Sequence, residues 1–500
     1  MAGILSDIVR EAAQRFPDRT AIVAADATLT YGELDPLADS VGAGLAAAGI
    51  RAGDLVSLVL PSNAAYIVGF LGLARLGAVA TGVSPRYTAA ERAKVVAKAS
   101  PVAAMVTDDL AEGLPADLPL LRATDARWTG LRRDGAVPPP VEFREDLPET
   151  VVFTSGTTGT PKGALFTSRQ IAAITQMDTG GSWGHGGPQI VSTGLPHIGF
   201  MTKLAGYFQS GATLHVLERW RAKDVLEIVN RERVPIIGGV AAQVALLLAV
   251  PEFDTYDFSC VQGLIVGAGP SQAALIRESK ARFGCGYSVR YSSTESGGLG
   301  TMTAFDAPEE ETLHTVGRPR PGTDLEIRDP DTGKVLGPNE VGQICLRSPA
   351  IMAGYWNDPE NTAVAIDSEG FLRTGDLGLI GADGCLRVTG RIGEMFIRGG
   401  YNVFPLEVEA VLLHHPAIAN VAVVPRPDAT MGEIGVAVIV PRAGHEPPSL
   451  EELRTFARES LAAYKVPEAI RVVDELPLTG MDKLDRTALR AYEKDAAGVN

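Results

Sequence analysis

The chain has 500 residues, more than one compact domain usually holds, and its length allows about three domains. Hydrophobic residues make up 45% of the sequence and charged residues 21%, a globular composition that excludes a largely disordered chain. The 45 basic and 60 acidic side chains give a net charge of −15, which argues against broad electrostatic binding to nucleic acids or anionic membranes and favours a soluble enzyme.

Cysteine usage and apolar stretches point to neither a zinc site nor secretion. The four cysteines form no CxxC pair and the seven histidines no HxxxH pair, so we interpret the cysteines as small packed hydrophobes. The first residues carry charges at Asp7, Arg10 and Glu11 and lack the apolar core of a signal peptide. The apolar stretch 66–83 contains Arg75 and four glycines, which favours a buried helix and strand over a membrane span. We therefore expect a cytoplasmic protein with no integral membrane segment and no nucleic-acid partner.

Helix and strand patterns alternate along the first 300 residues. They predict helices over 5–16 and 271–283 and strands over 21–24, 55–60, 151–153 and 264–267. Ser62 is expected to cap the helix that follows the buried strand 55–60. This order predicts layered sheets with helices packed on their faces.

After residue 320 the pattern changes to short strands, separated by Asp-Pro, Thr-Gly and Asp-Gly turns. The predicted strands are 324–328, 341–347 and 385–388, and beyond residue 392 come helices over 405–414 and 450–463 and strands over 421–424 and 434–440. We place a boundary at Arg391 because a self-contained α+β segment of about 110 residues follows it. The expected fold is a multidomain α/β protein. A large N-terminal domain (1–391) holds layered αβ sheets and a β-rich subdomain, and a small mobile α+β domain (392–500) follows.

The strongest chemical signal is the segment Thr154-Ser-Gly-Thr-Thr-Gly-Thr-Pro-Lys162, which follows a predicted strand. Its glycines and hydroxyls can direct N–H and O–H groups at phosphate oxygens, while Lys162 supplies a positive charge. It is not a Walker A loop, because Pro161 stands where that pattern needs its GK[ST] run. Taken alone, the segment fits either a phosphate site or a surface loop stiffened by proline.

This loop resembles the phosphate-binding signature of the adenylate-forming (ANL) superfamily, which includes acyl-CoA synthetases, non-ribosomal peptide adenylation domains and firefly luciferase. Further segments resemble the later motifs in the family's order: Tyr291-Ser-Ser-Thr-Glu295 (adenine and magnesium), Thr374-Gly-Asp376 (ribose), Gly390-Arg391 with Gly399-Gly400-Tyr401-Asn402-Val403 (the segment joining the domains), and Pro477-Leu-Thr-Gly-Met-Asp-Lys483 (the C-terminal lysine). Because five motifs occur in order over residues 154–486, the chain is identified as a member of this superfamily.

The resemblance implies an AMP-forming acyl-CoA ligase, an acid–thiol ligase that uses ATP and CoA as co-substrates and Mg²⁺ as cofactor. Family members join a carboxylate to ATP, forming an acyl-adenylate and pyrophosphate, and then pass the acyl group to a thiol. Because the carboxylate attacks an anionic phosphate, the reaction needs charge neutralisation more than acid–base help.

By the same resemblance, the catalytic residues are Lys483, Thr294 and Glu295. Glu295 is expected to hold Mg²⁺, and Lys483 to contact the α-phosphate and the substrate carboxylate. The nucleotide-binding residues implied are Thr154, Ser155, Gly156, Thr157, Thr158, Gly159, Lys162, Gly267, Ala268, Gly269, Tyr291, Ser292, Asp376 and Arg391. Within this set, Asp376 is expected to accept hydrogen bonds from the ribose hydroxyls, with Arg391 beside it.

Three residues depart from the family pattern. Ser292 stands where glycine is usual, Asp482 precedes the lysine in place of glycine, and Gly393 occupies the pivot where Asp or Lys is typical. We expect Gly393 still to act as the hinge between two orientations of the C-terminal domain, since glycine tolerates nearly any φ/ψ. Asp482 is expected to point to solvent.

The resemblance places the acyl pocket at His197, Gly239, Gly297 and Gly298, where the glycines are expected to leave volume. A histidine in this position is also compatible with the core. The segment 198–204 (IGFMTKL) has no acidic residue to pair with an ammonium group, which counts against an amino acid substrate. We therefore expect an apolar acid of moderate to large size.

For the acceptor, the resemblance favours CoA, because residues 399–405 match the CoA ligase form of their segment. Arg398, Gly399, Gly400 and Tyr401 are the expected CoA-binding residues. Two alternatives stay open: a stand-alone adenylating enzyme that loads a carrier protein, and a catalytically silent nucleotide-binding protein. Dimers are common in the superfamily, so a homodimer is one expected state.

Overall fold

The structure, a computed structural model, describes residues 3–154, 161–269, 271–478 and 484–496. The chain divides into two compact units, one formed by residues 1–325 and 346–372 and the other by residues 326–345 and 373–500. The boundary expected at residue 391 concerns the pivot between domains and stays a prediction.

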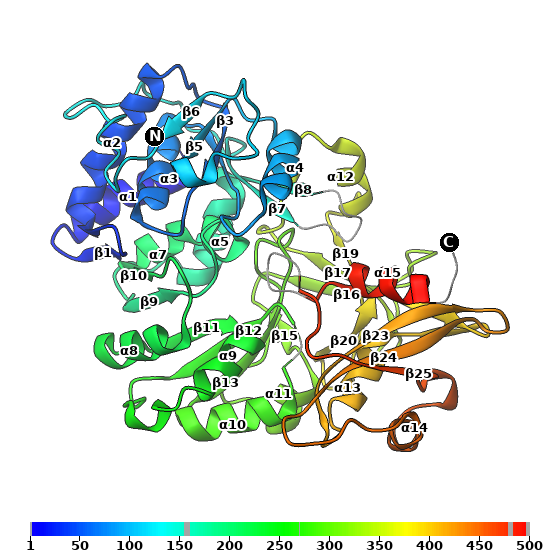
Figure 1. Cartoon of the computed structure of the whole chain (residues 1–500). Helices are drawn as coiled ribbons and strands as arrows, with labels where there is room; N and C mark the ends of the chain where they lie inside the picture. Colours follow the sequence, from blue (N-terminus) through cyan, green and yellow to red (C-terminus); the bar gives the residue numbers. More distant parts are fainter. Residues whose placement is uncertain (1–2, 155–160, 270, 479–483, 497–500) are drawn as a thin grey trace. The chain divides into compact units, whose positions relative to one another are not determined.

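The largest sheet belongs to the first unit and has the strand order β18-β8-β7-β4-β3-β5-β6. Its strands are β3 (Leu55–Val59), β4 (Val79–Gly82), β5 (Ala103–Val106), β6 (Leu120–Arg122), β7 (Pro148–Thr154), β8 (Lys162–Thr167) and β18 (Gly354–Tyr355). Every residue of β3, β4 and β5 is buried, as expected for parallel strands covered on both faces. The helices near it are α1 (Ile4–Arg15), α2 (Tyr31–Ala47), α3 (Ala64–Leu76) and α4 (Ala89–Ala99), and α1 to α3 lie side by side in Figure 1.

Two smaller sheets complete the first unit, with the orders β2-β1-β10-β9 and β11-β12-β13-β14-β15. Their strands are β1 (Thr20–Val23), β2 (Thr28–Thr30), β9 (Pro188–Val191), β10 (Thr213–Val216), β11 (Ile236–Val240), β12 (Gly263–Gly267), β13 (Gly286–Tyr291), β14 (Thr301–Met302) and β15 (Arg318–Pro319). The remaining helices are α5 (Ser168–Thr179), α6 (Ile198–Met201), α7 (Leu204–Ser210), α8 (Ala222–Glu232), α9 (Ala241–Leu248), α10 (Ala273–Phe283), α11 (Glu309–His314) and α12 (Pro359–Ala365), with 3₁₀ turns η1 (Asp108–Leu110) and η2 (Phe253–Thr255). Leu226, Leu247 and Ile276 bring α8, α9 and α10 into one core with β12 and β13.

The second unit holds most of the sheet β16-β17-β19-β20 and all of the sheet β22-β21-β24-β23, in which β25 also pairs with β24. The strands are β16 (Asp324–Arg328), β17 (Gly342–Arg347), β19 (Leu372–Ile380), β20 (Leu386–Arg391), β21 (Phe396–Arg398), β22 (Tyr401–Val403), β23 (Ile418–Asp428), β24 (Gly432–Pro441) and β25 (Ala469–Val472). The helices are α13 (Pro405–Leu412), α14 (Leu450–Arg458) and α15 (Arg486–Ala496), with a 3₁₀ turn η3 (Ala463–Lys465). Val408 and Leu453 pack α13 and α14 against Ile439 of β24.

The expected fold class is confirmed: layered αβ sheets, a β-rich sheet after residue 320 and a smaller α+β segment are all present. Two local predictions are wrong. Asn63, not Ser62, caps α3, because its side chain accepts the N–H of Tyr66 at 3.1 Å, while the Ser62 hydroxyl accepts the N–H of Leu195. The helix expected over 450–463 ends at Arg458, since Leu461 turns back into the core.

The cysteines are free thiols, and Cys345 and Cys385 are buried, in agreement with the packing interpretation. None of the helices in the described part of the chain is both long enough and apolar enough to cross a bilayer.

Candidate functional site

The predicted phosphate loop is the connection of a β-hairpin in the first unit. β7 and β8 pair antiparallel with Thr154 opposite Lys162, and the Thr154 hydroxyl donates to the Lys162 carbonyl oxygen at 3.4 Å. Five predicted phosphate-binding residues lie outside the described residues: Ser155, Gly156, Thr157, Thr158 and Gly159. Strand pairing therefore fixes both ends of the loop, and Lys162 begins a strand that the sequence analysis did not predict.

Two neutral groups hold the Lys162 side chain. Its Nζ donates to the Oδ1 of Asn361 at 2.9 Å and lies 5.3 Å from the ring centre of Tyr355. Asn361 is fixed in turn by Asp358, which caps α12 and accepts from both its backbone and its side-chain nitrogen. Within the described residues no carboxylate pairs with Lys162, so its positive charge is available to an anion.

A tight turn after β13 presents Thr294 and Glu295. The backbone N–H of Ser293 donates to the Ser296 hydroxyl at 2.9 Å, and the N–H of Ser296 donates to the Ser293 hydroxyl at 3.1 Å. The N–H of Gly298 closes the turn on the Ser293 carbonyl at 3.1 Å. These reciprocal bonds fix the backbone of the two residues expected to carry catalysis.

Tyr355 connects Lys162 with Glu295. Its hydroxyl donates to the Oε1 of Glu295 at 2.9 Å, and its ring lies beside the Lys162 ammonium. Because Tyr355 pairs with Ala164 across β18 and β8, it is a diagonal neighbour of Lys162 on one face of the sheet. The N–H of Met352 also donates to the Glu295 carbonyl at 2.9 Å, which ties the Glu295 turn to the segment leading into β18.

Tyr355 and Asn361 were not predicted from the sequence. Only the aromatic pair at 355–356 after a glycine hinted at a packed segment, and β18 is two residues long. Lys162 and Glu295, which were predicted from separate motifs, thus both contact the side chain of Tyr355.

The residues expected to bind adenine lie at the carboxyl ends of two adjacent parallel strands. Gly267 ends β12, Tyr291 ends β13, and the two strands pair in parallel. Ala268 has φ 64°, the left-handed region that side chains rarely adopt, and such strain concentrates at binding loops. Gly269 and Ser292 follow at this edge, where open α/β sheets bind ligands.

The glycines expected in the acyl pocket differ in how much space lies beside them. A Cβ on Gly297 would meet the Ala350 carbonyl oxygen at 2.4 Å, and one on Gly239 would meet the Gln243 side chain at 2.7 Å. A Cβ on Gly298 would find its nearest atom, Cε of Lys203, at 3.5 Å. The volume expected beside Gly297 is therefore filled by backbone, while Gly298 keeps its space.

His197 lies at the start of α6, where its Nδ1 accepts the N–H of Gly199 at 3.3 Å. The ring is half-buried.

In the second unit, Asp376 and Arg391 lie opposite each other in the β19–β20 pair. Arg391 Nε is 3.4 Å from Asp376 Oδ1, and the N–H of Asp376 donates to the Thr374 hydroxyl at 3.1 Å. The Arg391 side chain is 41% exposed, so the ion pair adds little stability and leaves the guanidinium accessible. Strand register thus brings together the two residues expected at the ribose.

The predicted CoA segment is a β-hairpin with a two-residue turn. Arg398 of β21 pairs with Tyr401 of β22, and Gly399 and Gly400 between them have φ 53° and 87°. Two successive positive φ values define a turn that matches the twist of hairpin strands and that glycine adopts without strain. Arg398 forms an ion pair with Glu468, so its charge is already partly compensated.

The expected hinge, Gly393, has φ 84° and is held by the C-terminal helix. Arg490 of α15 donates to the carbonyl oxygens of Gly393 and Glu394, both at 2.9 Å. Arg486, on the same helix, pairs with Glu394 at 3.2 Å and with Glu409 at 2.7 Å. Lys483 and Asp482, just before this helix, lie outside the described residues.

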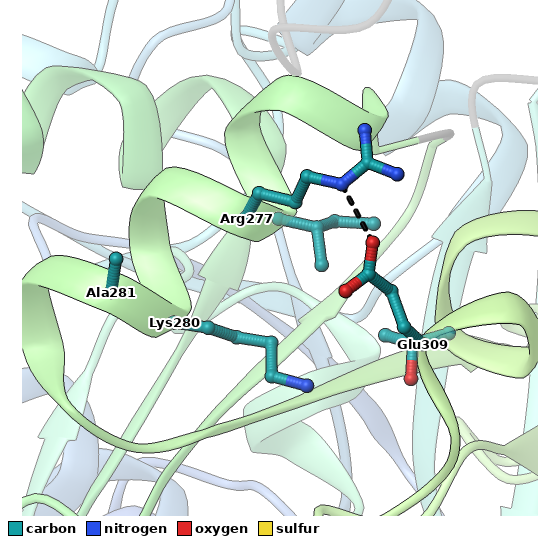
Figure 2. A pocket seen from close by; sticks show the side chains of 6 residues that line it. Arg277, Lys280, Ala281 and Glu309 are labelled. Atoms are coloured by element: carbon teal, nitrogen blue, oxygen red, sulfur yellow. Dashed lines mark hydrogen bonds and ion pairs between the residues drawn. The ribbon is translucent and has the colours of Figure 1, made fainter.

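A separate surface pocket of about 350 Å³ lies between α10 and α11 and is drawn in Figure 2. Arg277 and Glu309 form an ion pair across it at 2.7 Å, and both side chains are more than half exposed. None of the residues predicted from the motifs lines this pocket. We assign it no chemistry.

Family profiles match both parts of the chain. The profile of the AMP-binding enzyme family covers residues 9–356, and that of the AMP-binding enzyme C-terminal domain covers residues 407–483. The chain belongs to the AMP-binding enzyme family. The first profile includes the segments 154–162 and 291–295 and the second ends at Lys483, whereas the segments 374–376 and 390–403 lie between the two profiles.

This AMP-binding enzyme is similar over nearly its whole length to named ligases. It is 32% identical over 513 residues to the 3-[(3aS,4S,7aS)-7a-methyl-1,5-dioxo-octahydro-1H-inden-4-yl]propanoyl:CoA ligase of Mycobacterium tuberculosis, covering 95% of this chain and 96% of the relative. It is 30% identical over 494 residues to the fatty acid–[acyl-carrier-protein] ligase ScoC of Streptomyces coeruleorubidus, covering 96% and 94%. Among solved structures, a Mycobacterium tuberculosis fatty acyl CoA synthetase matches with a TM-score of 0.77 and 28% identity over 99% of each chain.

Proposed function

We propose that the protein is an AMP-forming acyl-CoA ligase. A carboxylate oxygen of the acid attacks the α-phosphorus of ATP, the bond to the β-phosphate breaks, and pyrophosphate leaves. The CoA thiol then attacks the acyl carbon, AMP leaves, and the thiol proton passes to solvent. The observation that carries the proposal is the convergence of Lys162 and Glu295 on Tyr355, in a chain that matches ligases along its length.

Glu295 suits a magnesium ion bound with ATP. Its Oε1 accepts from Tyr355, and its Oε2 has no hydrogen-bond partner among the described residues. One carboxylate oxygen together with substrate phosphates is a donor set that Mg²⁺ favours in nucleotide sites. No cluster of three or more His, Cys, Asp or Glu that could hold a metal occurs elsewhere in the described ranges. When bound, the ion neutralises negative charge on the phosphates.

The chain's own residues then have these proposed tasks. Lys162 attracts the phosphates, the Thr294 hydroxyl donates to the α-phosphate, and Lys483 contacts the α-phosphate and the acid during adenylation. Asp376 and Arg391 bind the ribose. The remaining nucleotide and CoA residues, and His197, Gly239 and Gly298 at the acyl pocket, keep the roles that the sequence motifs imply, whereas Gly297 serves close packing against Ala350. Gly393 acts as the hinge.

Two finer expectations accompany this function. We propose a cytoplasmic location, where ATP and CoA are available, and a homodimer. Light scattering of the purified protein measures the second directly.

Pyrophosphate and AMP release across a panel of fatty, aromatic, dicarboxylic and alicyclic acids tests the proposal, with and without CoA and with ATP and Mg²⁺ throughout. We expect AMP and acyl-CoA in equal amounts for at least one acid, and loss of both in Lys483→Ala. The alternative, a ligase for a carrier protein, corresponds to the name of the Streptomyces relative, but the other named relatives favour CoA. It predicts pyrophosphate release without CoA consumption and acylation of an added holo-carrier protein. No AMP with any acid would contradict both.

A further inference from the structure

A cluster of charged side chains lies beside Gly298 in the first unit. Lys203 Nζ is 2.8 Å from the Oδ2 of Asp178, and Arg320 is 2.9 Å from its Oδ1. Arg290 of β13 and Tyr207, one helical turn after Lys203, lie near enough for the charge of Asp178 to raise the pKa of each. These five residues come from α5, the start of α7, β13 and the segment after β15, and we refer to them as the Lys203 cluster.

The Lys203 cluster carries more positive than negative charge. Lys203 and Arg320 pair with the one carboxylate of the cluster, and the charge of Arg290 acts on the same group. Within the described residues Lys203 donates a single hydrogen bond, to Asp178. The Nε of Arg290 is buried without a partner. The Lys203 side chain is only 8% exposed, so water satisfies little of its remaining capacity. Buried cations without matching anions are costly and are usually paired in a functional state.

The pKa shifts of the clustered side chains agree with this excess of positive charge. Burial lowers the pKa of Lys203 to about 8, although Asp178 opposes that shift. Burial also lowers the pKa of Arg290. Burial alone would raise the pKa of Asp178, but its pairs with Lys203 and Arg320 hold it below the usual value.

The cluster adjoins residues assigned to the acid. Lys203 follows His197 and Ile198 on one segment, and its Cε lies 3.5 Å from the position of a Cβ on Gly298. Gly298 closes the turn that presents Glu295, and the N–H of Arg320 donates to the Gly300 carbonyl at 2.9 Å. The Lys203 cluster therefore borders Gly298, the expected acyl-pocket glycine that keeps its space.

We propose that the Lys203 cluster binds a second carboxylate, at the end of the substrate distant from the one that reacts. The inference rests on the proposed function and names the acid class: a dicarboxylic acid with an apolar middle. The second carboxylate accepts hydrogen bonds from the spare N–H groups of Lys203 and from Arg290. The expectation of a wholly apolar acid is thereby changed at one end of the molecule.

Matched acids test the proposal on the full-length protein. For each chain length, kcat/KM is measured for the α,ω-dicarboxylic acid, its monomethyl ester and the monocarboxylic acid ending in methyl. We expect the wild type to prefer the dicarboxylic acid over its monoester by about tenfold or more, since the monoester leaves the cations unpaired. In Lys203→Met this preference should fall to about one, whereas Lys223→Met, which breaks an exposed ion pair with Glu252, should keep it.

Equal or better use of the monoester or the methyl-ended acid by the wild type would overturn the inference while leaving the ligase function intact. That comparison needs no variant, so it decides the question even if Lys203→Met does not fold. If no acid yields AMP, the ligase function fails, and calorimetry of the dicarboxylic acid against its monoester still tests the cluster. Binding of neither acid, or of both equally, would then overturn it.

A pH series supplies an independent readout. Burial lowers the pKa of Lys203 to about 8 and raises that of Tyr207 to about 12, while the pairs with Lys203 and Arg320 hold the pKa of Asp178 below its usual value. Lys203 is therefore the group expected to titrate between pH 7 and 9. As pH rises through about 8, Lys203 loses its proton and its positive charge. We therefore expect the ratio of kcat/KM for the dicarboxylic acid to that for the monoester to fall several-fold. A ratio that stays constant over this range contradicts the assignment to Lys203.

Discussion

Removing one hydroxyl group, by Tyr355→Phe, tests how the site holds Glu295. The change deletes the 2.9 Å hydrogen bond to Glu295 Oε1 and keeps the ring beside Lys162. A hydrogen bond to a charged group contributes about 1.5–3 kcal/mol. Because Tyr355 and Glu295 are both partly exposed, we take the lower end, which corresponds to about a tenfold change.

The expected result is a rise of about tenfold in the Mg²⁺ concentration that gives half-maximal pyrophosphate release, with the acid and ATP saturating. Lys162 keeps its contact with the aromatic face, so the KM for ATP at saturating Mg²⁺ should change by less than about threefold. The matched control is Tyr31→Phe, which deletes a 2.6 Å bond to the Ala212 carbonyl and should lower stability without altering the Mg²⁺ dependence.

A double-mutant cycle with Glu295→Gln makes the reasoning refutable. If Tyr355 acts through Glu295, adding Tyr355→Phe to Glu295→Gln should cost almost nothing more. Independent, additive losses would show that the hydroxyl acts elsewhere. An unchanged Mg²⁺ dependence in Tyr355→Phe would show that the bond to Glu295 has no part in metal binding.

The other predictions concern the second unit. Arg490→Met removes both hydrogen bonds to the Gly393 and Glu394 carbonyl oxygens. In rapid-quench assays we expect thioester formation to slow several-fold while the rate of adenylate formation stays nearly unchanged. An equal loss of rate in both steps would exclude a role specific to the hinge. Arg486→Leu leaves Glu409, which is 6% exposed, without its paired cation, and should lower the free energy of unfolding of this unit by about 3–5 kcal/mol. Urea unfolding of the full chain measures that loss, and a change below about 1 kcal/mol would contradict it.

The sequence predicted the elements with strong periodicity and the residues with distinctive motifs. The strand before the phosphate loop, the buried helix within 66–83 and the α+β pattern after residue 392 follow from apolar spacing and turn residues alone. Lys162, Glu295 and Asp376 were identifiable because their neighbours are unusual. Capping was predicted less well, since Ser62 and Asn63 are both good capping residues and only tertiary contacts choose between them.

Residues that act through long-range pairing were not predictable. Tyr355 lies on a two-residue strand whose partner, β8, is far away in the sequence, and its role depends on the register that sets it opposite Ala164. The filled space beside Gly297 likewise depends on the backbone of Ala350, which no local pattern places there. A glycine in a motif therefore does not distinguish pocket volume from close packing.

The same limit applies to the expectation of an apolar acid of moderate to large size. The segment 198–204 contains one charged residue, Lys203, and the expectation of an apolar acid rested on the lack of an acidic partner for an ammonium group in that segment. Any nearby carboxylate can neutralise a lysine in such a segment. Whether the lysine can also bind an anionic substrate group therefore depends on the other charged side chains that the fold places beside it. Here the fold adds Arg290 and Arg320 but one carboxylate, Asp178. Since the motifs that activate the reacting carboxylate are those of AMP-binding enzymes in general, we expect this protein to distinguish its substrate at the far end of the acid.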